Sequence, residues 1–139
     1  MLKAVIDTNV FISGLLKDSI NRQIIILLKN SKFTPVISTE TLGEFIDVIS
    51  RPKFHNVITR EIAEELIEII KTHAVLVKPS QKLEIIKDDP DDNRFLEAAV
   101  ASKVDFVVSG DSHLLSLKNF HNIPIITPKE FLRRLNKIW

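Results

Sequence analysis

The stretch AVIDTNVFI (residues 4–12) decides how the rest of the chain is read. A short apolar run ends abruptly in Asp7, Thr8 and Asn9, and apolar residues resume at Val10. Because Asp, Thr and Asn all cap helices well, the stretch fits an ordinary turn between a strand and a helix. It also fits a ligand site, because open α/β sheets bind ligands just beyond the carboxyl ends of their strands. The choice depends on whether the chain forms such a sheet.

Short apolar runs rich in Val and Ile recur along the chain and alternate with segments of helical periodicity. The runs are too short and too continuous for amphipathic helices and are typical of buried parallel strands. They cover residues 4–6, 35–37, 74–77, 106–108 and 124–126. Stripes of apolar residues with helical spacing begin at Ile20, Leu42, Ile62 and Phe95, and a last helix is expected from Pro128 to Trp139. Strands that alternate with helices predict a three-layer α/β/α fold around a parallel sheet of about five strands.

The composition favours one domain of an ordinary globular protein. No linker rich in Gly, Pro or Ser divides the sequence, so residues 1–139 are expected to form a single domain. The absence of cysteine excludes disulfides and thiolate metal sites, and three glycines leave no glycine-rich phosphate loop. No run approaches the ~20 apolar residues of a membrane span, so we expect a cytoplasmic location and no membrane partner. The net charge of +1 indicates no basic field over the whole domain, although a local basic strip could still bind nucleic acid.

Acidic residues follow two of the predicted strands and precede one predicted helix. Asp7 ends the first strand, Asp111 follows the fourth, and an acidic run over residues 88–92 comes just before the helix that leads into the fourth strand. If the first and fourth strands are neighbours, Asp7 and Asp111 flank the point where the strand order reverses, which is where such folds bind ligands. Taken singly, each acid is more often a helix cap or a solvated turn residue. Their convergence at one edge of the sheet favours a binding site.

Several carboxylates at one sheet edge would repel one another and raise each other's pKa unless a cation neutralises them. The sequence offers no suitable cluster of His and Cys, so the predicted cofactor is a cation that prefers oxygen ligands, Mg²⁺ or Mn²⁺. Such an ion keeps water ligands and binds substrate phosphates, so phosphoryl chemistry is the expected reaction.

Three motifs in order resemble a PIN domain. They are VIDTNVFISGLL (residues 5–16), STETLGEFIDVISRPKF (residues 38–54) and DPDDNRFLEAAVASKVDFVVSGDSHLL (residues 89–115). The chain is most similar to the bacterial and archaeal subfamily described as toxins of toxin–antitoxin modules, and the resemblance runs from residue 2 to about residue 130. It implies a ribonuclease that uses a cluster of acids to hold one or two divalent ions and hydrolyses RNA phosphodiesters.

The resemblance also implies which acids form the site. The catalytic, metal-binding residues carried over from the motifs are Asp7, Glu44, Asp92 and Asp111. Periodicity alone does not select Glu44, because it shares a polar helix face with other acids. Asp89 and Asp91 compete with Asp92 for the third position, and Asp92 is preferred because its spacing to the following helix matches the family.

Polar and basic residues complete the expected site. Thr8, Asn9 and Ser109 resemble the polar residues that brace the acids from behind. Phosphate contacts are expected first from Arg51 and Lys53, because the RPKF segment recurs in the resembled subfamily. Other cations near the expected site edge are Lys17, Arg22 and Arg94, and His113 is the only histidine placed to reach the site, although the predicted ligand set omits it.

The expected partners are an RNA substrate, an antitoxin protein and a second copy of the chain. The second copy is expected because Ile25 and Ile26 widen one apolar helix face.

Other functions stay open on the same fold. A phosphatase or phosphotransferase with an aspartyl nucleophile usually has a second acid two residues after the first, where this chain has Asn9. A phospho-receiver would use Lys129, but the third strand ends without an acid. A domain that binds RNA or a protein without cleavage would use the same acidic cleft.

Overall fold

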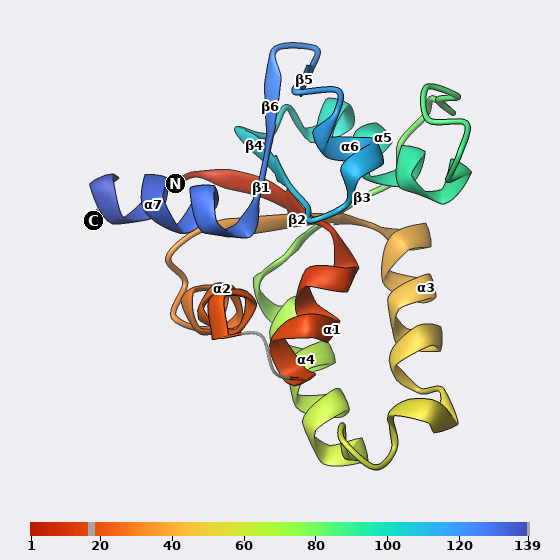
Figure 1. The fold of residues 1–139 in the computed structure, drawn as a ribbon, viewed down its shortest axis with the longest axis vertical. Helices are drawn as coiled ribbons and strands as arrows, with labels where there is room; N and C mark the ends of the chain where they lie inside the picture. Colours follow the sequence, from red (N-terminus) through yellow and green to blue (C-terminus); the bar gives the residue numbers. More distant parts are fainter. Residues whose placement is uncertain (17–18, 139) are drawn as a thin grey trace.

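A single mixed sheet forms the centre of the molecule (Figure 1). The structure, a computed structural model, describes residues 1–16 and 19–138. The strands are ordered β3-β2-β1-β4-β6-β5, and all neighbours are parallel except β5 and β6. Their bounds are β1 Lys3–Ile6, β2 Thr34–Ser38, β3 Val75–Val77, β4 Phe106–Val108, β5 Asn119–Phe120 and β6 Ile123–Ile126.

The five parallel strands are those predicted from the apolar runs, and β5 is an addition. Asn119 pairs with Pro124 and Phe120 with Ile123, so two residues form the hairpin turn between β5 and β6. Those two residues, His121 and Asn122, both have left-handed backbone angles, with φ of 50° and 64°. Such turns usually carry Asn-Gly or Asp-Gly. The His-Asn pair gave no such signal in the sequence.

Helices cover both faces of the sheet. All five expected helices are present, four of them from apolar stripes and the fifth from Pro128. The helix that follows β1 was only one reading of the opening stretch, and the short helix after β4 was not predicted. The α-helices are α1 Thr8–Leu16, α2 Ser19–Lys29, α3 Thr39–Ile49, α4 Arg60–His73, α5 Asn93–Ser102, α6 Ser112–Leu115 and α7 Pro128–Ile138, and two 3₁₀ turns cover η1 Pro52–Phe54 and η2 Pro90–Asp92. Trp139, the predicted last residue of α7, lies outside the described residues.

Two hydrophobic cores lie on opposite sides of the sheet. Ala4 and Ile6 of β1 point into the core under α1, α2, α3, α4 and α7, whereas Val5 points into the core under α5 and α6. This alternation follows from the two-residue period of a strand. The predicted three-layer α/β/α architecture is therefore confirmed.

The third predicted strand is less buried than its sequence suggested. Leu76 is 53% exposed and Val75 is also exposed, because β3 is the edge strand of the sheet. An apolar run therefore identified the strand correctly but overestimated its burial. No helix in the described part of the chain has the length and apolar character needed to span a membrane.

Helices α1 and α2 approach each other closely at Gly14. A Cβ atom placed on Gly14 would lie 3.0 Å from the backbone carbonyl carbon of Asn21 and 2.8 Å from Ile25 Cδ1. Gly43, in α3, is also helical, but a Cβ there would meet nothing within 4 Å. The two positions therefore separate the effect of close packing from the effect of helix propensity.

We expect Gly14→Ala to destabilise the protein by about 1–3 kcal/mol, because the backbone of α2 would have to move. Gly43→Ala is the matched control and should stabilise it by about 0.5–1 kcal/mol through helix propensity. Urea unfolding followed by circular dichroism measures both changes. If Gly14→Ala instead raised the free energy of unfolding, the backbone of α2 would have to move aside without destabilising the protein, contrary to this prediction.

Candidate active site

The acids at the strand ends meet because β1 and β4 are neighbours. Val5 lies opposite Val107 and Ile6 opposite Val108, and the Asp7 amide extends the pairing by donating to the Val108 carbonyl at 2.9 Å. The chain proceeds from β1 to β2 on one side and reaches β4 on the other, so the strand order reverses between β1 and β4. The predicted ligand position beyond the carboxyl ends of these strands is therefore present in the fold.

Asp7 both caps a helix and faces the site. Its side chain is 2% exposed, and Oδ1 accepts a hydrogen bond from the Asn9 amide at 3.0 Å at the start of α1. Oδ2 accepts a hydrogen bond from the Ser109 hydroxyl at 2.7 Å. Burial raises the pKa of Asp7, the two hydrogen bonds oppose the rise, and the charges of Asp111 and Asp89 add to it. The capping explanation and the ligand explanation thus describe the same residue.

Ser109 connects the first acid to the last. It is fully buried, its amide donates to the Ile126 carbonyl, and its hydroxyl accepts a hydrogen bond from the Asp111 amide at 2.9 Å. Asp111 in turn caps α6, because its Oδ1 accepts from the His113 amide at 2.7 Å. Ser109 therefore orients one carboxylate directly and the backbone of the other.

The remaining bracing residues differ in how they act. Asn9 is exposed and supports Asp7 through its backbone N–H, not through its amide side chain. Thr8 begins α1 directly after Asp7, and no hydrogen bond joins its side chain to the Asp7 carboxylate within the described part of the chain.

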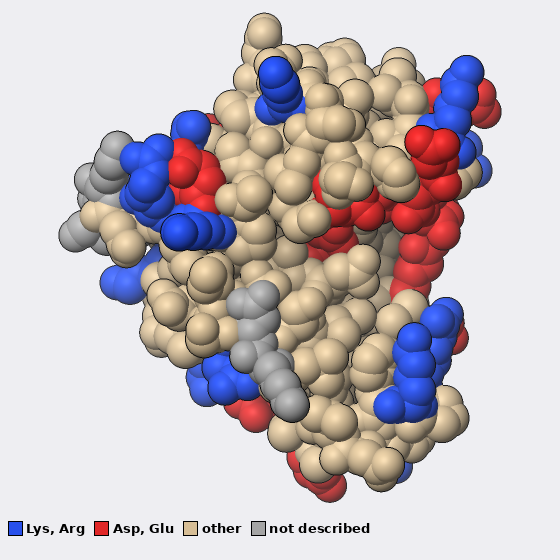
Figure 2. All heavy atoms as spheres, in the orientation of Figure 1, with Lys and Arg blue, Asp and Glu red and all other residues tan. Residues whose placement is uncertain are grey.

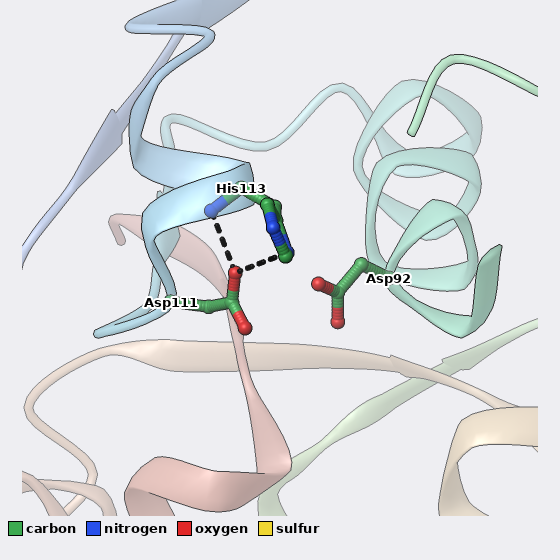
Figure 3. A group of neighbouring side chains, drawn as sticks. All are labelled: Asp92, Asp111 and His113. Carbon is green, nitrogen blue, oxygen red and sulfur yellow. Dashed lines mark hydrogen bonds and ion pairs between the residues drawn. The ribbon is translucent and has the colours of Figure 1, made fainter. Parts of the chain in front are cut away.

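Asp92 brings a third carboxylate to the site from the opposite side. It ends η2 just before α5, is 7% exposed, and its Oδ2 is buried without a hydrogen-bond partner among the described residues. Burial is the first cause that raises its pKa to about 7, followed by the charges of Asp111, Asp89 and Asp7. Figure 3 shows its carboxylate facing Asp111 and His113. An unpartnered, buried carboxylate that faces a second one requires a cation or a proton.

Asn93 holds the acidic run against α5. Its side-chain oxygen accepts from the amides of Ile85 and Ile86, and its amide group donates to the carbonyls of Ile86 and Pro90, all at 2.8–3.0 Å. With this clamp in place, Asp92 is buried, Asp89 is half-buried and Asp91 is exposed. The structure thus places Asp92 deepest among the three competing acids.

Glu44 is exposed on α3, and it is not in the group of possible metal ligands found among the described residues. Ser38 caps its helix, because the Ser38 hydroxyl accepts from the Thr41 amide at 3.0 Å. Phe45 of the same helix packs edge-on against Phe11 of α1 with ring centroids 5.9 Å apart. Partial burial raises the pKa of Glu44, Asp91 and Glu40 add to the rise, and Arg94 opposes it. Figure 2 shows acidic side chains gathered around a hollow beside the end of α3 that leads from β2.

His113 joins the acids, although the predicted ligand set omitted it. Its Nδ1 lies 3.5 Å from Asp111 Oδ1 and its Nε2 lies 3.8 Å from Asp88 Oδ2. Ligand atoms of Asp92, Asp111 and His113 all lie within 4.8 Å of one another. Of the four histidines, His113 is the one that the sequence placed within reach of the site, and the structure brings it beside Asp111. In the sequence, the sign of this contact was the position of His113 two residues after Asp111. In the structure, this position is in the first turn of α6, the helix that Asp111 caps.

The donors at this site fit a divalent cation. Buried carboxylates on Asp7 and Asp92 and the half-buried Asp111 offer oxygen ligands, and His113 offers a ring nitrogen. Beside them a pocket of about 300 Å³ is lined by Asp7, Asn9, Val10, Ser13, Asn21, Gly110, Asp111 and Pro128. The acids would hold such an ion, and the pocket beside them would accept a substrate group.

The two cations preferred for phosphate contacts, Arg51 and Lys53, lie beyond the end of α3 that points away from the acids at the strand ends. Arg51 follows α3 at its far end and pairs with Asp47 at 3.5 Å, and Lys53 lies over the Phe54 ring. Arg22 donates to backbone carbonyls at the end of α1, and Arg94 pairs with the buried Glu97 at 3.3 Å. Lys17 lies outside the described residues.

Asp92 predicts a pH dependence of stability in the metal-free protein. Its folded-state pKa of about 7 exceeds the ordinary value of 3.8, so stability is lost as the pH rises toward and through 7. From about pH 5 to about pH 8, the free energy of unfolding of the wild type should fall by about 2–3 kcal/mol relative to Asp92→Asn. Urea titrations across this range in EDTA measure the difference. Asp105→Asn, at the other end of β4, is the control, and parallel curves for wild type and Asp92→Asn would contradict the assignment.

The chain is similar over its length to known proteins. It is 30% identical over 149 residues to an uncharacterized protein of Methanocaldococcus jannaschii, MJ1680, and the match covers 98% of this chain and 93% of that protein. Its fold is similar to the crystal structure of VapBC2 from Rickettsia felis bound to a DNA fragment from their promoter, with a TM-score of 0.60 and 17% identity, over 91% of this chain and 98% of that one.

The family is established by a direct sequence match. The model of the PIN domain matches residues 3–113, which include the acids at both strand ends and the acidic run. The chain therefore belongs to the PIN domain family, whose members are nucleases.

Proposed function

We propose that this protein is a metal-dependent endoribonuclease that hydrolyses RNA phosphodiester bonds and acts as the toxin of a toxin–antitoxin module. The observation that carries the proposal is the buried Oδ2 of Asp92, which has no hydrogen-bond partner among residues 1–16 and 19–138. The Asp92 carboxylate faces Asp111 at the point where the strand order reverses. Carboxylates brought together there need a cation, and Mg²⁺ or Mn²⁺ held by oxygen ligands binds phosphates.

Each residue has a definite part in this proposal. Asp7, Asp92 and Asp111 hold the ion, and Glu44 completes the site from the margin. Ser109 orients Asp7 through its hydroxyl and Asp111 through the backbone, and the Asn9 amide fixes the second oxygen of Asp7. Thr8 supports the turn that follows β1. The bound ion supplies activation of the attacking water and stabilisation of the leaving oxygen.

The fold weighs against the phospho-receiver reading. Receivers have the strand order 2-1-3-4-5, whereas here β1 lies between β2 and β4. An aspartyl-phosphate enzyme is also disfavoured, because the position two residues after Asp7 holds Asn9 and not a second acid. The Asn9 side chain is exposed, and Asn9 contacts the Asp7 carboxylate through its backbone N–H.

We expect Asp7→Asn to abolish cleavage of labelled RNA while circular dichroism shows an intact fold. The change removes a charged ligand but keeps an oxygen that can accept from Ser109. Single-stranded and structured RNAs and a DNA strand would be tested with Mg²⁺, with Mn²⁺ and with EDTA. Asp105→Asn is the matched control, because Asp105 is an exposed acid that accepts from the Lys3 amide at the opposite end of the strands.

Equal activity of wild type and Asp7→Asn would mean that the cleavage comes from a contaminant and that the site assignment fails. Metal binding without cleavage of any RNA would favour a domain that only binds RNA or a partner. Cleavage of DNA alone would keep the nuclease and remove the RNA assignment.

The toxin role requires a protein partner. The structure of similar fold is of VapBC2 bound to a DNA fragment from its promoter. This similarity supports a pairing of the present protein with an antitoxin protein. Co-expression with the product of an adjacent gene tests it, because a true antitoxin should suppress cleavage. A homodimer is proposed through the exposed Ile26 on α2, and sedimentation equilibrium of wild type and Ile26→Lys decides it.

Arg51 and Lys53 are proposed to contact phosphates distant from the scissile bond, since α3 carries them away from the acids. In an Asp7→Asn background that cannot cleave, Arg51→Ala should weaken RNA binding and lower the salt dependence by about 0.7 in the log–log slope for one lost contact. Fluorescence anisotropy at several salt concentrations measures both. Arg60→Ala is the matched control, because Arg60 is also exposed and also pairs with an acid four residues away. Identical slopes for all three proteins would remove Arg51 from the RNA surface.

A further inference from the structure

We propose that His113 supplies a nitrogen ligand to the divalent ion at this site, so that the centre binds Mn²⁺ in preference to Mg²⁺. The inference rests on the metal-dependent function proposed above and adds a ligand outside its four acids. Three different segments contribute: the end of η2, the residue that caps α6, and α6 itself.

The three side chains converge on one small volume. Asp92, Asp111 and His113 each offer a ligand atom, and these atoms lie within 4.8 Å of one another. In Figure 3 the His113 ring stands beside the Asp111 carboxylate, and the Asp92 carboxylate faces both from the end of η2, just before α5. Ligands that share an ion at about 2.1 Å lie about 3–4 Å apart, so small side-chain rotations close the group around a metal.

Asp92 supplies the independent indication that a ligand belongs here. Asp92 is only 7% exposed, and its Oδ2 is buried without a hydrogen-bond partner among the described residues. A buried polar atom without a partner is costly, and native structures rarely leave one without a water or an ion. The carboxylate faces His113 as well as Asp111, so an ion that satisfies it lies within reach of the imidazole.

The orientation of the imidazole fits a metal ligand. Nδ1 lies 3.5 Å from Asp111 Oδ1, on the side of the acids, and Nε2 lies 3.8 Å from Asp88 Oδ2. Histidines that bind metals commonly direct the other ring nitrogen toward a carboxylate, which fixes the ring orientation. Nδ1 is therefore the nitrogen assigned to the ion, with Asp88 behind it.

The other histidines have different neighbours. His55 contacts the Ser50 carbonyl, His73 contacts the Ser31 hydroxyl, and His121 packs against the Phe120 ring. Within the described part of the chain, the group of possible metal ligands includes His113 and none of these three. They therefore provide internal controls of the same residue type.

A nitrogen ligand changes the preferred metal. Mg²⁺ demands oxygen ligands and keeps most of its water, whereas transition ions accept imidazole beside carboxylates. Loss of His113 should therefore weaken Mn²⁺ binding much more than Mg²⁺ binding.

The test is pulsed electron paramagnetic resonance of the full-length protein loaded with Mn²⁺, which detects a coordinated imidazole nitrogen through its modulation of the electron spin echo. Wild type would be compared with His113→Ala and with His55→Ala, because His55 is also exposed. Calorimetric titrations with Mn²⁺ and with Mg²⁺ would give the affinities, and circular dichroism would verify folding.

We expect nitrogen modulation in wild type and in His55→Ala and none in His113→Ala. The Mn²⁺ dissociation constant should rise about tenfold in His113→Ala, and the Mg²⁺ constant less than about twofold. Bound Mn²⁺ without nitrogen modulation in wild type, or modulation that persists in His113→Ala, would overturn the inference. In that case metal-dependent cleavage that Asp7→Asn abolishes would still stand. A wild type that binds no Mn²⁺ would overturn the inference and count against the metal-dependent function as well.

Discussion

The pairing of β1 with β4 is the constraint on which the rest of the site depends. It joins two segments about one hundred residues apart in the chain and places the residue after each strand at the same edge of the sheet. The register matters as much as the contact. A slip of one residue would turn the side chains of β4 toward the wrong cores and separate the Ser109 hydroxyl from Asp7. The buried valines of both strands therefore fix the positions of two acids, Asp7 directly through the Val108 carbonyl and Asp111 through the residues that follow β4.

The energetics of the site oppose those of the fold. The two cores and the capped helices stabilise the domain, whereas the buried carboxylates of Asp7 and Asp92 raise the cost of keeping charge inside. Hydrogen bonds from Ser109 and Asn9 offset part of this cost at Asp7, but Asp92 Oδ2 has no such compensation within the described residues. Conflict of this kind, between local cost and an otherwise consistent fold, is typical of functional sites.

Much of the fold could be predicted from the sequence because its signals are local. Val- and Ile-rich runs located the five parallel strands, apolar stripes located four helices, and Pro128 marked the start of a fifth. The hairpin turn at His121 and Asn122 was missed because its left-handed residues are not glycine, and α6 is too short to show a period. The exposure of Leu76 was also hidden, because the sequence does not say which strand lies at the edge.

The site was predicted in part, with limits that have a physical cause. Asp7 and Asp111 follow from their places at strand ends, but Glu44 and Asp92 were selected through a family resemblance. The depth of Asp92 depends on the Asn93 clamp, and the approach of His113 depends on the cap at Asp111. The burial of Asp92 and the approach of His113 both depend on hydrogen-bond geometry, which residue type alone does not reveal. Arg51 and Lys53 were expected near the acids, but the direction of α3 carries them away.

The clamp at Asn93 has a consequence for how this protein can evolve. The amide holds residues 85–90 only through their backbone N–H and carbonyl groups, so it places no demand on their side chains. Substitutions at the exposed Ile85 and Lys87 can therefore accumulate without loosening the segment, whereas the buried Ile86 is held by the core. The charge that surrounds the entrance can drift toward a new partner or substrate while the position of Asp92 is inherited unchanged.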